Sequence, residues 1–487
     1  MTNAWANPDS SFACGGSIET EVWQTWDENM HYFLMQQQLK KRLVQQADVY
    51  ALYDVQTYTH NLVSMARRCN RTKRLTEISI LIQTAYAELE PGTTSSPGRR
   101  WVCRGGSICN DKNRLLNKEV ILDSAQFLGL ASSIANALAL SNTPISNDER
   151  TFIENTIQIT SEHLLRWGND NAINSIFKKA EAEISDVKNG SSELFFTDYP
   201  LWLITIYAEI AGIIQNKDRR QLSNIALSDE NKARMHMHLS ALLRFFNARI
   251  YIYRNQDSTY GNLNLADLDR GYWRFYADNS YAGYEKEEKP IVCRFPDKDK
   301  SKYKIEVNVS ANTVPQRQDT GWDISHARRL VHALDALERN RNALKSIFSL
   351  DEDQLPIVGL TTAFANTLVA VMWNRDMAYP LFSNYWCGAN GWYRVGYDNG
   401  TRTCREGYPP FGLTNSFVTG GYITWARFKP VIGLLGQRLY DLISSPDVAD
   451  SSFINKYYPG LGKSVNSQVP SLARFMFLPS LVGVTEE

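Results

Sequence analysis

The chain has 487 residues, and its 52 Lys and Arg residues balance 52 Asp and Glu residues, so the formal net charge is zero. This balance argues against a general nucleic-acid-binding protein, because such proteins normally carry a basic excess. The composition, 43% hydrophobic and 21% charged, is typical of a globular protein and excludes intrinsic disorder. The 12 Trp, 24 Tyr and 20 Phe residues stand out. Aromatic rings suit the apolar faces of sugars, although they also fill ordinary protein cores.

The start of the chain, residues 1–16, contains neither the basic nor the apolar segment of a signal peptide. We expect a secreted or periplasmic protein whose signal peptide has been removed, with a cytosolic protein as the alternative. The two most apolar stretches, 120–140 and 200–214, both contain an acidic residue. Because a membrane-spanning helix needs about twenty apolar residues without such charges, they predict buried helices and no membrane span.

Amphipathic helices are predicted over most of the first two-thirds of the chain. Apolar residues recur mostly at spacings of three to five, the periodicity of a helix with one buried face. The sequence Ser146-Asn-Asp-Glu149 is a capping box, which marks a helix start. Helices are predicted over 19–51, 53–68, 73–89, 118–140, 146–167, 171–187, 197–216 and 228–254, with a basic, Gly-rich loop over 91–114.

The composition changes after residue 256. Residues 257–320 are rich in Tyr, Gly, Asn and Asp, and two short runs within them, 291–295 and 303–309, predict strands. The remaining predicted elements are helices over 323–348, 360–373 and 420–444, a long aromatic loop over 379–418 and an irregular tail over 445–487.

Ten or more amphipathic helices must bury their apolar faces on one another, and we find no fixed repeat of the kind that builds a solenoid. The pattern favours a mainly α fold, an (α/α) toroid of helical hairpins with a small β-containing insertion. The predicted units are an N-terminal extension (1–18), the first part of the toroid (19–256), an aromatic insertion (257–320), the remainder of the toroid (321–446) and an irregular C-terminal tail (447–487).

The seven cysteines leave at least one unpaired within the chain. Cys103 and Cys109 bracket a short loop, and Cys387 and Cys404 bracket a longer one rich in Gly and Asn, so two loop disulfides are one interpretation. Scattered free thiols are equally compatible with the spacing. The chain contains no CxxC, P-loop, GxGxxG, GxSxG or HExxH motif, so we expect neither a metal nor a cofactor.

Two short segments combine polar groups at helical spacing. In the predicted helix 53–68, Asp54, Tyr58 and Asn61 share one face and His60 lies on a neighbouring one, which indicates either a site or a polar network between helices. In the second segment, 321–329, either Asp323 or Ser325 can cap a helix on which His326 and Arg329 share a face. A helix N-terminus stabilises anions and favours a neutral imidazole that can accept a proton; a capping Asp and a surface His are the simpler interpretation.

Aromatic and polar side chains gather in the two long loops. Stacking rings and bidentate donors are what a polyhydroxylated, acidic ligand needs, whereas packing against the helices is the alternative role for these residues. The candidates are Trp273, Arg274 and Tyr281 in the insertion, Trp322 at its end, and Asn384, Tyr385, Trp386, Trp392, Arg394 and Glu406 in the later loop.

Over its helical two-thirds the pattern resembles the (α/α)-toroid carbohydrate-active enzymes, in particular polysaccharide lyases of the alginate and chondroitin type. Asn384-Tyr385-Trp386 and the segment 322–329 are similar to the Asn, His, Tyr and Arg groups that such lyases place in an aromatic-lined groove. The resemblance implies a polysaccharide or oligosaccharide partner and cleavage of an acidic glycan by β-elimination, and the balanced charge predicts no nucleic-acid partner.

The resemblance also implies roles for individual residues. His326 or His60 would remove the proton beside the carboxylate, Tyr385 would return one to the leaving oxygen, and Asn384 and Arg329 would neutralise the carboxylate. The implied substrate-binding residues are Tyr58, Asn61, Trp273, Arg274, Tyr281, Trp322, Asp323, Trp386, Trp392, Arg394 and Glu406.

Two alternatives remain open from the sequence. A glycoside hydrolase on the same scaffold would need a pair of carboxyl groups, for which Asp323 and Glu406 are candidates, with Asp54 and Asp278 in reserve. A non-catalytic glycan-binding surface protein would need only the aromatic and polar loops.

Overall fold

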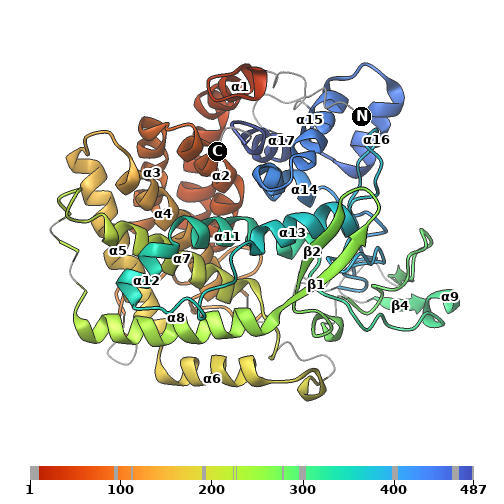
Figure 1. Cartoon of the computed structure of the whole chain (residues 1–487), viewed down its shortest axis with the longest axis horizontal. Helices are drawn as coiled ribbons and strands as arrows, with labels where there is room; N and C mark the ends of the chain where they lie inside the picture. Colours follow the sequence, from red (N-terminus) through yellow and green to blue (C-terminus); the bar gives the residue numbers. More distant parts are fainter. Residues whose placement is uncertain are drawn as a thin grey trace.

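A computed structural model describes residues 10–92, 97–110, 113–188, 193–222, 224–225, 227–276, 279–295, 303–397, 404–462 and 471–484. The fold is mainly helical and carries two small antiparallel sheets, which confirms the predicted class (Figure 1). The α-helices are α1 (Ser17–Thr25), α2 (Tyr50–Arg68), α3 (Thr72–Tyr86), α4 (Ile121–Leu140), α5 (Asn147–Trp167), α6 (Asp170–Glu181), α7 (Asp198–Gln215), α8 (Asp229–Arg249), α9 (Val309–Asn312), α10 (Ile324–Ala327), α11 (Arg329–Arg339), α12 (Arg341–Phe348), α13 (Leu360–Thr367), α14 (Ser416–Thr419), α15 (Val431–Ser444), α16 (Val448–Tyr457) and α17 (Leu472–Phe477). The strands are β1 (Ile250–Asp257), β2 (Gly261–Leu268), β3 (Ile291–Arg294) and β4 (Lys304–Val307). Helices with π-type hydrogen bonding cover Trp26–Met30, Phe33–Gln45 and Leu368–Met372.

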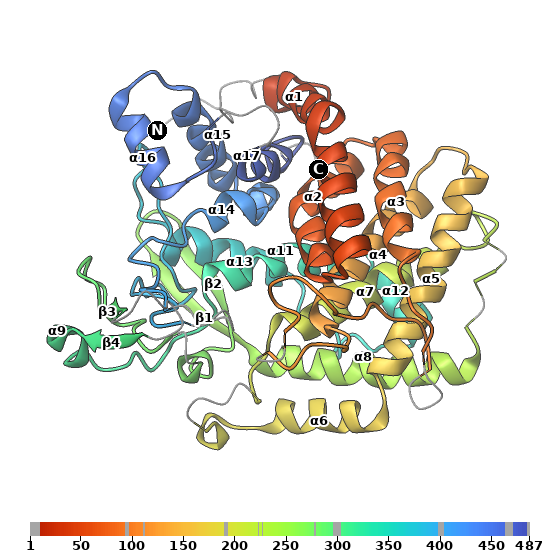
Figure 2. The same ribbon diagram turned by 180° about the vertical axis from the view of Figure 1, so that it is seen from behind.

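The helices of the first two-thirds pack in two layers. Helices α2, α4, α7 and α11 contact one another in succession and form one layer (Figures 1 and 2). Helices α3, α5, α8 and α12 also contact one another in succession and form the second layer. Helix α6 packs on the outer side of α8. The consecutive pairs α2–α3, α4–α5 and α7–α8 are in contact, and α4 and α7 are the most deeply buried of these helices.

The two apolar stretches of the sequence form the helices α4 and α7, which pack against each other at the centre of the molecule. Side chains are buried all round both helices, as the sequence predicts. The two helices approach closely: a Cβ atom at Gly129 of α4 would lie 2.7 Å from the ring of Trp202 on α7, and one at Gly212 of α7 would lie 2.7 Å from Nδ2 of Asn136 on α4. Among the described residues, none of the helices is both long and apolar enough to span a bilayer.

The C-terminal segment packs against the start of the chain. Asn61 of α2 donates to the carbonyl oxygens of Thr419 (3.2 Å) and Met476 (2.8 Å), and Arg68 donates to those of Pro479 and Val482. The prediction of an irregular tail over 447–487 is therefore wrong for α16 and α17, which are helices. These helices are short and owe their stability to tertiary packing, so they lack the long periodic pattern that reveals a helix in a sequence.

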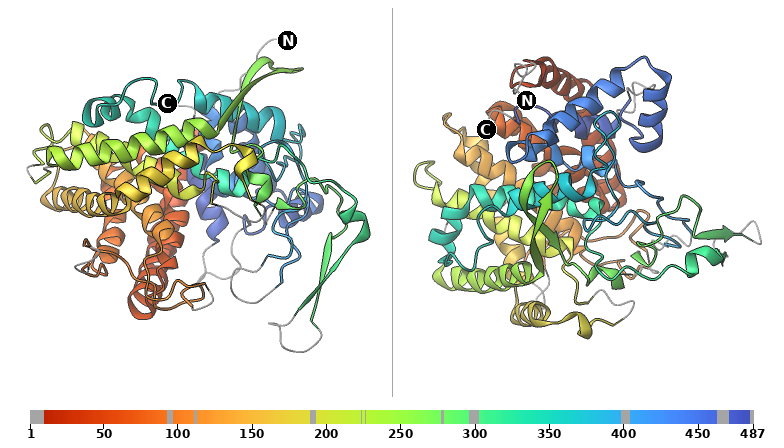
Figure 3. Two further views of the ribbon diagram at one scale, coloured as in Figure 1. Left: turned by 90° about the horizontal axis from the view of Figure 1, so that it is seen from below. Right: turned by 45° about the vertical axis from the view of Figure 1, so that its right-hand side comes forward.

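The structure also contains a β-hairpin that the sequence prediction missed. Helix α8 ends at Arg249, and the chain continues directly as β1, which pairs with β2 from Ile250 opposite Leu268 to Asp257 opposite Gly261. The predicted helix over 228–254 is thus too long, because the β-branched and aromatic run from Ile250 to Tyr253 favours a strand. The predicted strands 291–295 and 303–309 are confirmed as β3 and β4. Both hairpins extend from the helical body in Figure 3.

Three disulfide bonds connect described cysteines. Cys14–Cys69 joins the segment before α1 to the end of α2, and Cys103–Cys109 closes the short predicted loop. The other predicted pair is wrong: Cys404 bonds to Cys293 on β3, and Cys387 is free and buried. The insertion folds back onto the aromatic loop and brings Cys293 to Cys404, a proximity that spacing within the loop does not reveal.

This pairing predicts the outcome of peptide mapping without reduction. Cys293 and Cys404 should be recovered in one linked peptide pair, and Cys387 should react with a maleimide only after the chain is unfolded, because its thiol is buried. Recovery of a peptide linking Cys387 to Cys404 would contradict the structure.

Candidate functional site

A cavity of about 400 Å³ lies where the start of α2, the α10–α11 junction, the aromatic loop and the end of α16 meet. Its lining includes His326, three arginines, one lysine and four tyrosines. We call it the cationic pocket. Its charged and aromatic lining residues include Tyr53, His326, Arg328, Arg329, Tyr393, Arg394, Tyr408, Lys456 and Tyr457. No Asp or Glu side chain lines it among the residues that the structure describes. The pocket is therefore suited to an anion.

Asp323 holds His326 in place at the edge of this pocket. As the predicted N-cap of α10, Asp323 accepts hydrogen bonds through Oδ1 from the backbone N–H groups of Ser325 (3.0 Å) and His326 (3.1 Å). Its Oδ2 accepts a hydrogen bond from Nδ1 of His326 at 2.6 Å. Burial favours the protonated carboxyl, but the contacts with His326 and Ser325 outweigh it and hold the pKa of Asp323 below its ordinary range. Because Nδ1 donates to an ionised Asp323, Nε2 is the ring nitrogen left to accept a proton.

Aromatic rings surround the imidazole. Trp273 and Trp322 meet His326 edge-on at ring-centre distances of 5.4 and 6.3 Å, and the Tyr393 hydroxyl lies 3.3 Å from Nδ1. Trp322 is itself fixed by a hydrogen bond from its Nε1 to the carbonyl of Phe196. The ring of His326 therefore has little rotational freedom.

Tyr53, on the first turn of α2, also lines the cationic pocket. Its hydroxyl accepts hydrogen bonds from Nη2 of Arg329 (2.7 Å) and Nη2 of Arg328 (3.2 Å). Burial alone would raise the pKa of the Tyr53 phenol, but the two guanidinium groups lower it below its ordinary value. The phenol is thus a better proton donor than an ordinary tyrosine.

Arg329 connects α11 to α2, α7 and α10. Besides Tyr53, it donates through Nη1 to the carbonyl of Ser325 at 2.9 Å, and its Nη2 lies 3.3 Å from Oδ2 of Asp198 on the first turn of α7. Its side chain is buried, whereas Arg328 is half-buried. Because its charge is matched by Asp198 and satisfied by fixed acceptors, Arg329 is rigid, and Arg328 is the more accessible guanidinium.

Comparisons with protein-family models, with curated proteins and with solved structures found no match for this chain.

The structure brings three of the predicted site residues, His326, Arg329 and Arg394, to the lining of the cationic pocket. Asp323 and Trp322 lie directly behind His326. The segment 321–329 is therefore the predicted segment that lies nearest to the cationic pocket.

The Asn384-Tyr385-Trp386 segment does not line the cationic pocket. Asn384 is fully buried; its amide donates to the carbonyls of Gly391 and Pro409 and accepts from the backbone N–H of Leu413, so it holds the aromatic loop together. The Tyr385 hydroxyl donates to the carbonyl of Trp392. The indole N–H groups of Trp386 and Trp392 donate to the carbonyls of Ala266 and Lys286. These polar groups satisfy buried backbone atoms.

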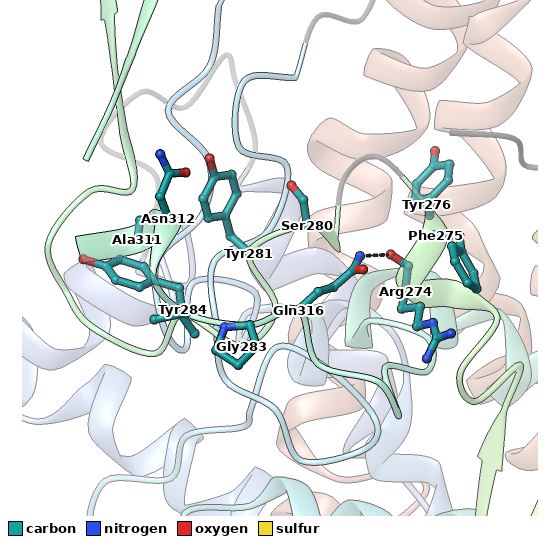
Figure 4. A pocket seen from close by; sticks show the side chains of 12 residues that line it. Arg274, Phe275, Tyr276, Ser280, Tyr281, Gly283, Tyr284, Ala311, Asn312 and Gln316 are labelled. Atoms are coloured by element: carbon teal, nitrogen blue, oxygen red, sulfur yellow. Dashed lines mark hydrogen bonds between the residues drawn. The ribbon is translucent and has the colours of Figure 1, made fainter. Parts of the chain in front are cut away.

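The remaining predicted residues lie at other places. Arg274 and Tyr281 line a second cavity, shown in Figure 4, while Glu406 forms an ion pair with Lys289. Trp273 is buried beneath Tyr276. Tyr58 is half-buried against Phe33, where burial raises its pKa to about 12, and Asn61 joins α2 to the C-terminal segment. Asp54 pairs with Arg42, and Asp278 lies outside the described residues.

His60 is buried away from the cationic pocket. Its ring stacks on that of His332, with ring centres 3.6 Å apart, and Nε2 of Gln56 lies 2.8 Å from its Nδ1. Burial and the neighbouring His332 lower the pKa of His60 well below its ordinary value, and burial lowers that of His332 to about 3. Both rings are therefore neutral near pH 7. The placement favours a role in the core for His60.

Sequence reasoning missed several residues of the cationic pocket, chiefly Tyr53, Arg328 and Tyr393, and also Lys456 and Tyr457. Tyr53 and Arg328 lie within the two segments that the sequence singled out. The sequence therefore marked both segments, but it did not show that these two residues contact each other. Lys456 and Tyr457 belong to α16, for which no sequence signal was found. Among the described residues, no cluster of His, Cys, Asp and Glu is placed to hold a metal ion.

The stacked histidines predict a specific dependence of stability on pH. Because the pKa values of both rings are lower in the folded chain than in the unfolded chain, the unfolded state binds more protons as the pH falls below about 6.5. The free energy of unfolding should therefore fall on acidification, and the His332→Gln variant should lose roughly 2 kcal/mol less than the parent chain between pH 7 and pH 5. Urea titrations at each pH measure this difference.

Identical pH dependence for His332→Gln and the parent chain would show that the buried ring is protonated in the folded state.

Proposed function

We propose that the chain binds an acidic polysaccharide in the cationic pocket and cleaves it by β-elimination. The observation that carries this proposal is the joint presence, on one pocket without carboxylates among the described residues, of a histidine oriented by Asp323 and a tyrosine bound to two arginines. A proton acceptor, a proton donor and a site for a carboxylate are the three groups that the reaction needs.

Electrostatics supports binding of a uronate. Arg328, Arg394 and Lys456 all line the pocket with Arg329. A carboxylate that enters the pocket loses its hydration shell, and hydrogen bonds from these charged donors compensate for that loss. Guanidinium groups bind carboxylates in a bidentate manner, and the tyrosine rings of the pocket offer surfaces for the apolar face of a sugar.

Each step of the reaction is assigned to a residue that lines the cationic pocket. Arg328 and Arg329 neutralise the carboxylate, which makes the hydrogen on the adjacent carbon more acidic. His326 takes that proton through Nε2; the electron pair of the C–H bond forms a C=C bond as the glycosidic C–O bond breaks, and the Tyr53 hydroxyl gives its proton to the leaving oxygen. Solvent then returns a proton to Tyr53 and removes one from His326.

These roles differ from the sequence-based hypothesis at two positions and choose between its two candidate bases. We assign proton return to Tyr53, because the Tyr385 hydroxyl is engaged with a backbone carbonyl. Carboxylate neutralisation falls to Arg328 with Arg329, because the Asn384 amide is engaged within the loop. His326 is the base in preference to His60, which stacks in the core.

Pocket composition favours elimination over hydrolysis. A glycoside hydrolase needs two carboxyl groups about 5–10 Å apart across the scissile bond. Of the candidates, Asp323 is buried behind His326 and Glu406 pairs with Lys289. Neither lines the cationic pocket.

The proposal extends to the fold type and to the cellular compartment. We propose that the two layers of helical hairpins are an arc of the (α/α)-toroid type, with the cationic pocket at one end of the arc. The three disulfide bonds are typical of proteins that fold in an oxidising compartment, which supports the expectation of a secreted or periplasmic protein.

An ultraviolet assay tests the reaction. A panel of uronate-containing polysaccharides should include at least one that gives a rising ultraviolet absorbance with the full chain, because elimination creates a C=C bond conjugated to the carboxylate. His326→Ala and Tyr53→Phe should each lower the initial rate by about 10²- to 10⁴-fold, the usual contribution of a general acid or base.

Tyr251→Phe is the matched control for Tyr53→Phe, since this tyrosine is 49% exposed on β1 and should leave the rate unchanged. Binding without a change in absorbance would favour the non-catalytic glycan-binding alternative. Full activity in both site variants would contradict the assignment of the cationic pocket.

A further inference from the structure

A second cavity, of about 420 Å³, lies between the segment 274–284 and the segment 311–316. We call it the tyrosine pocket, because Tyr276, Tyr281 and Tyr284 line it. Figure 4 shows the polar ends of Ser280, Tyr281 and Asn312 pointing to the same side. The pocket is framed by the hydrogen bond from Nε2 of Gln316 to the carbonyl of Arg274 at 2.6 Å.

The chemistry of the tyrosine pocket differs from that of the cationic pocket. Arg274 is the one side chain on its lining, within the described segments, that carries a charge near pH 7, and its guanidinium donates to Gln318. The other polar groups are hydroxyls and amides, which hydrogen-bond sugar hydroxyls without a charge. Rings, hydroxyls and amides together suit a neutral sugar.

A chain of ring contacts joins the two pockets. Tyr276 stacks on Trp273 with ring centres 4.8 Å apart, and Trp273 meets His326 at 5.4 Å. The centres of Tyr276 and His326 are therefore at most about 10 Å apart. The backbone N–H of Gly391 also donates to the carbonyl of Ala282, which ties the wall of the tyrosine pocket to the loop that carries Tyr393 and Arg394. The ring of Trp273 between the two pockets is buried, and their separation is of the order of one disaccharide.

We infer that the substrate is a polymer in which an acidic sugar alternates with a neutral one, and that the tyrosine pocket binds the neutral unit next to the acidic unit in the cationic pocket. This inference rests on the proposed function. A polymer made only of uronates would place a second carboxylate against hydroxyls, amides and an arginine already bonded to Gln318, so that charge would lose water without gaining an equivalent partner.

Calorimetric titration of the full chain at low salt tests the inference with three probes. The first is an oligosaccharide of alternating glucuronate and N-acetylglucosamine, the second an oligogalacturonate of equal length, and the third a neutral N-acetylglucosamine oligomer. The alternating probe should bind at least ten-fold more tightly than the oligogalacturonate. Tyr281→Ala and Asn312→Ala should each remove most of that difference and leave oligogalacturonate binding unchanged.

Asn312 is exposed, so its substitution leaves folding intact even if Tyr281→Ala disturbs the loop. Equal binding of the two acidic probes, or an unchanged preference in the Asn312→Ala variant, would overturn the inference. If the neutral oligomer binds and Asn312→Ala weakens it while neither acidic probe binds, the proposed function fails and the neutral-sugar site stands. If none of the probes binds, both fail.

Discussion

One buried carboxylate determines the geometry of the candidate site. Asp323 accepts hydrogen bonds from two backbone N–H groups of α10 and from the ring of His326, so a single side chain starts a helix and orients an imidazole. Its neighbour Ile324 donates from the backbone to the carbonyl of Asn384, which binds the aromatic loop to the same point. A buried, ionised carboxylate is stable only when such donors surround it, and the surrounding structure is therefore built to hold it.

Arg329 provides the second constraint. It lies on α11 and contacts α2, α7 and α10 through Tyr53, Asp198 and the carbonyl of Ser325, so four helices meet at one guanidinium. Because these protein groups fix Arg329, it supplies the pocket with a rigid positive charge, and the more accessible Arg328 beside it can adjust to a bound carboxylate. The same contact lowers the pKa of the Tyr53 phenol, so the packing of the helices and the chemistry of the pocket share one interaction.

Local spacing revealed the parts of the site that lie within one segment. Asp323, His326 and Arg329 follow the pattern of a helix N-terminus, which can be read from the sequence. Tyr53 was missed as a site residue because its partner Arg329 lies 276 residues away, and no local pattern encodes that contact. Asn384 shows the opposite error: an amide in an aromatic loop can bind a ligand or satisfy buried carbonyls, and only the folded loop distinguishes the two. The mainly helical class was predictable from periodicity, whereas β1 was not separated from α8 because no turn residue divides them.

The most direct measurement of the central claim is a crystal structure of the Tyr53→Phe variant with an acidic oligosaccharide bound. The proposal predicts a sugar carboxylate between Arg328 and Arg329, with the carbon that bears it facing Nε2 of His326. An oligosaccharide bound away from this pocket, or a carboxylate bound without either arginine, would contradict it.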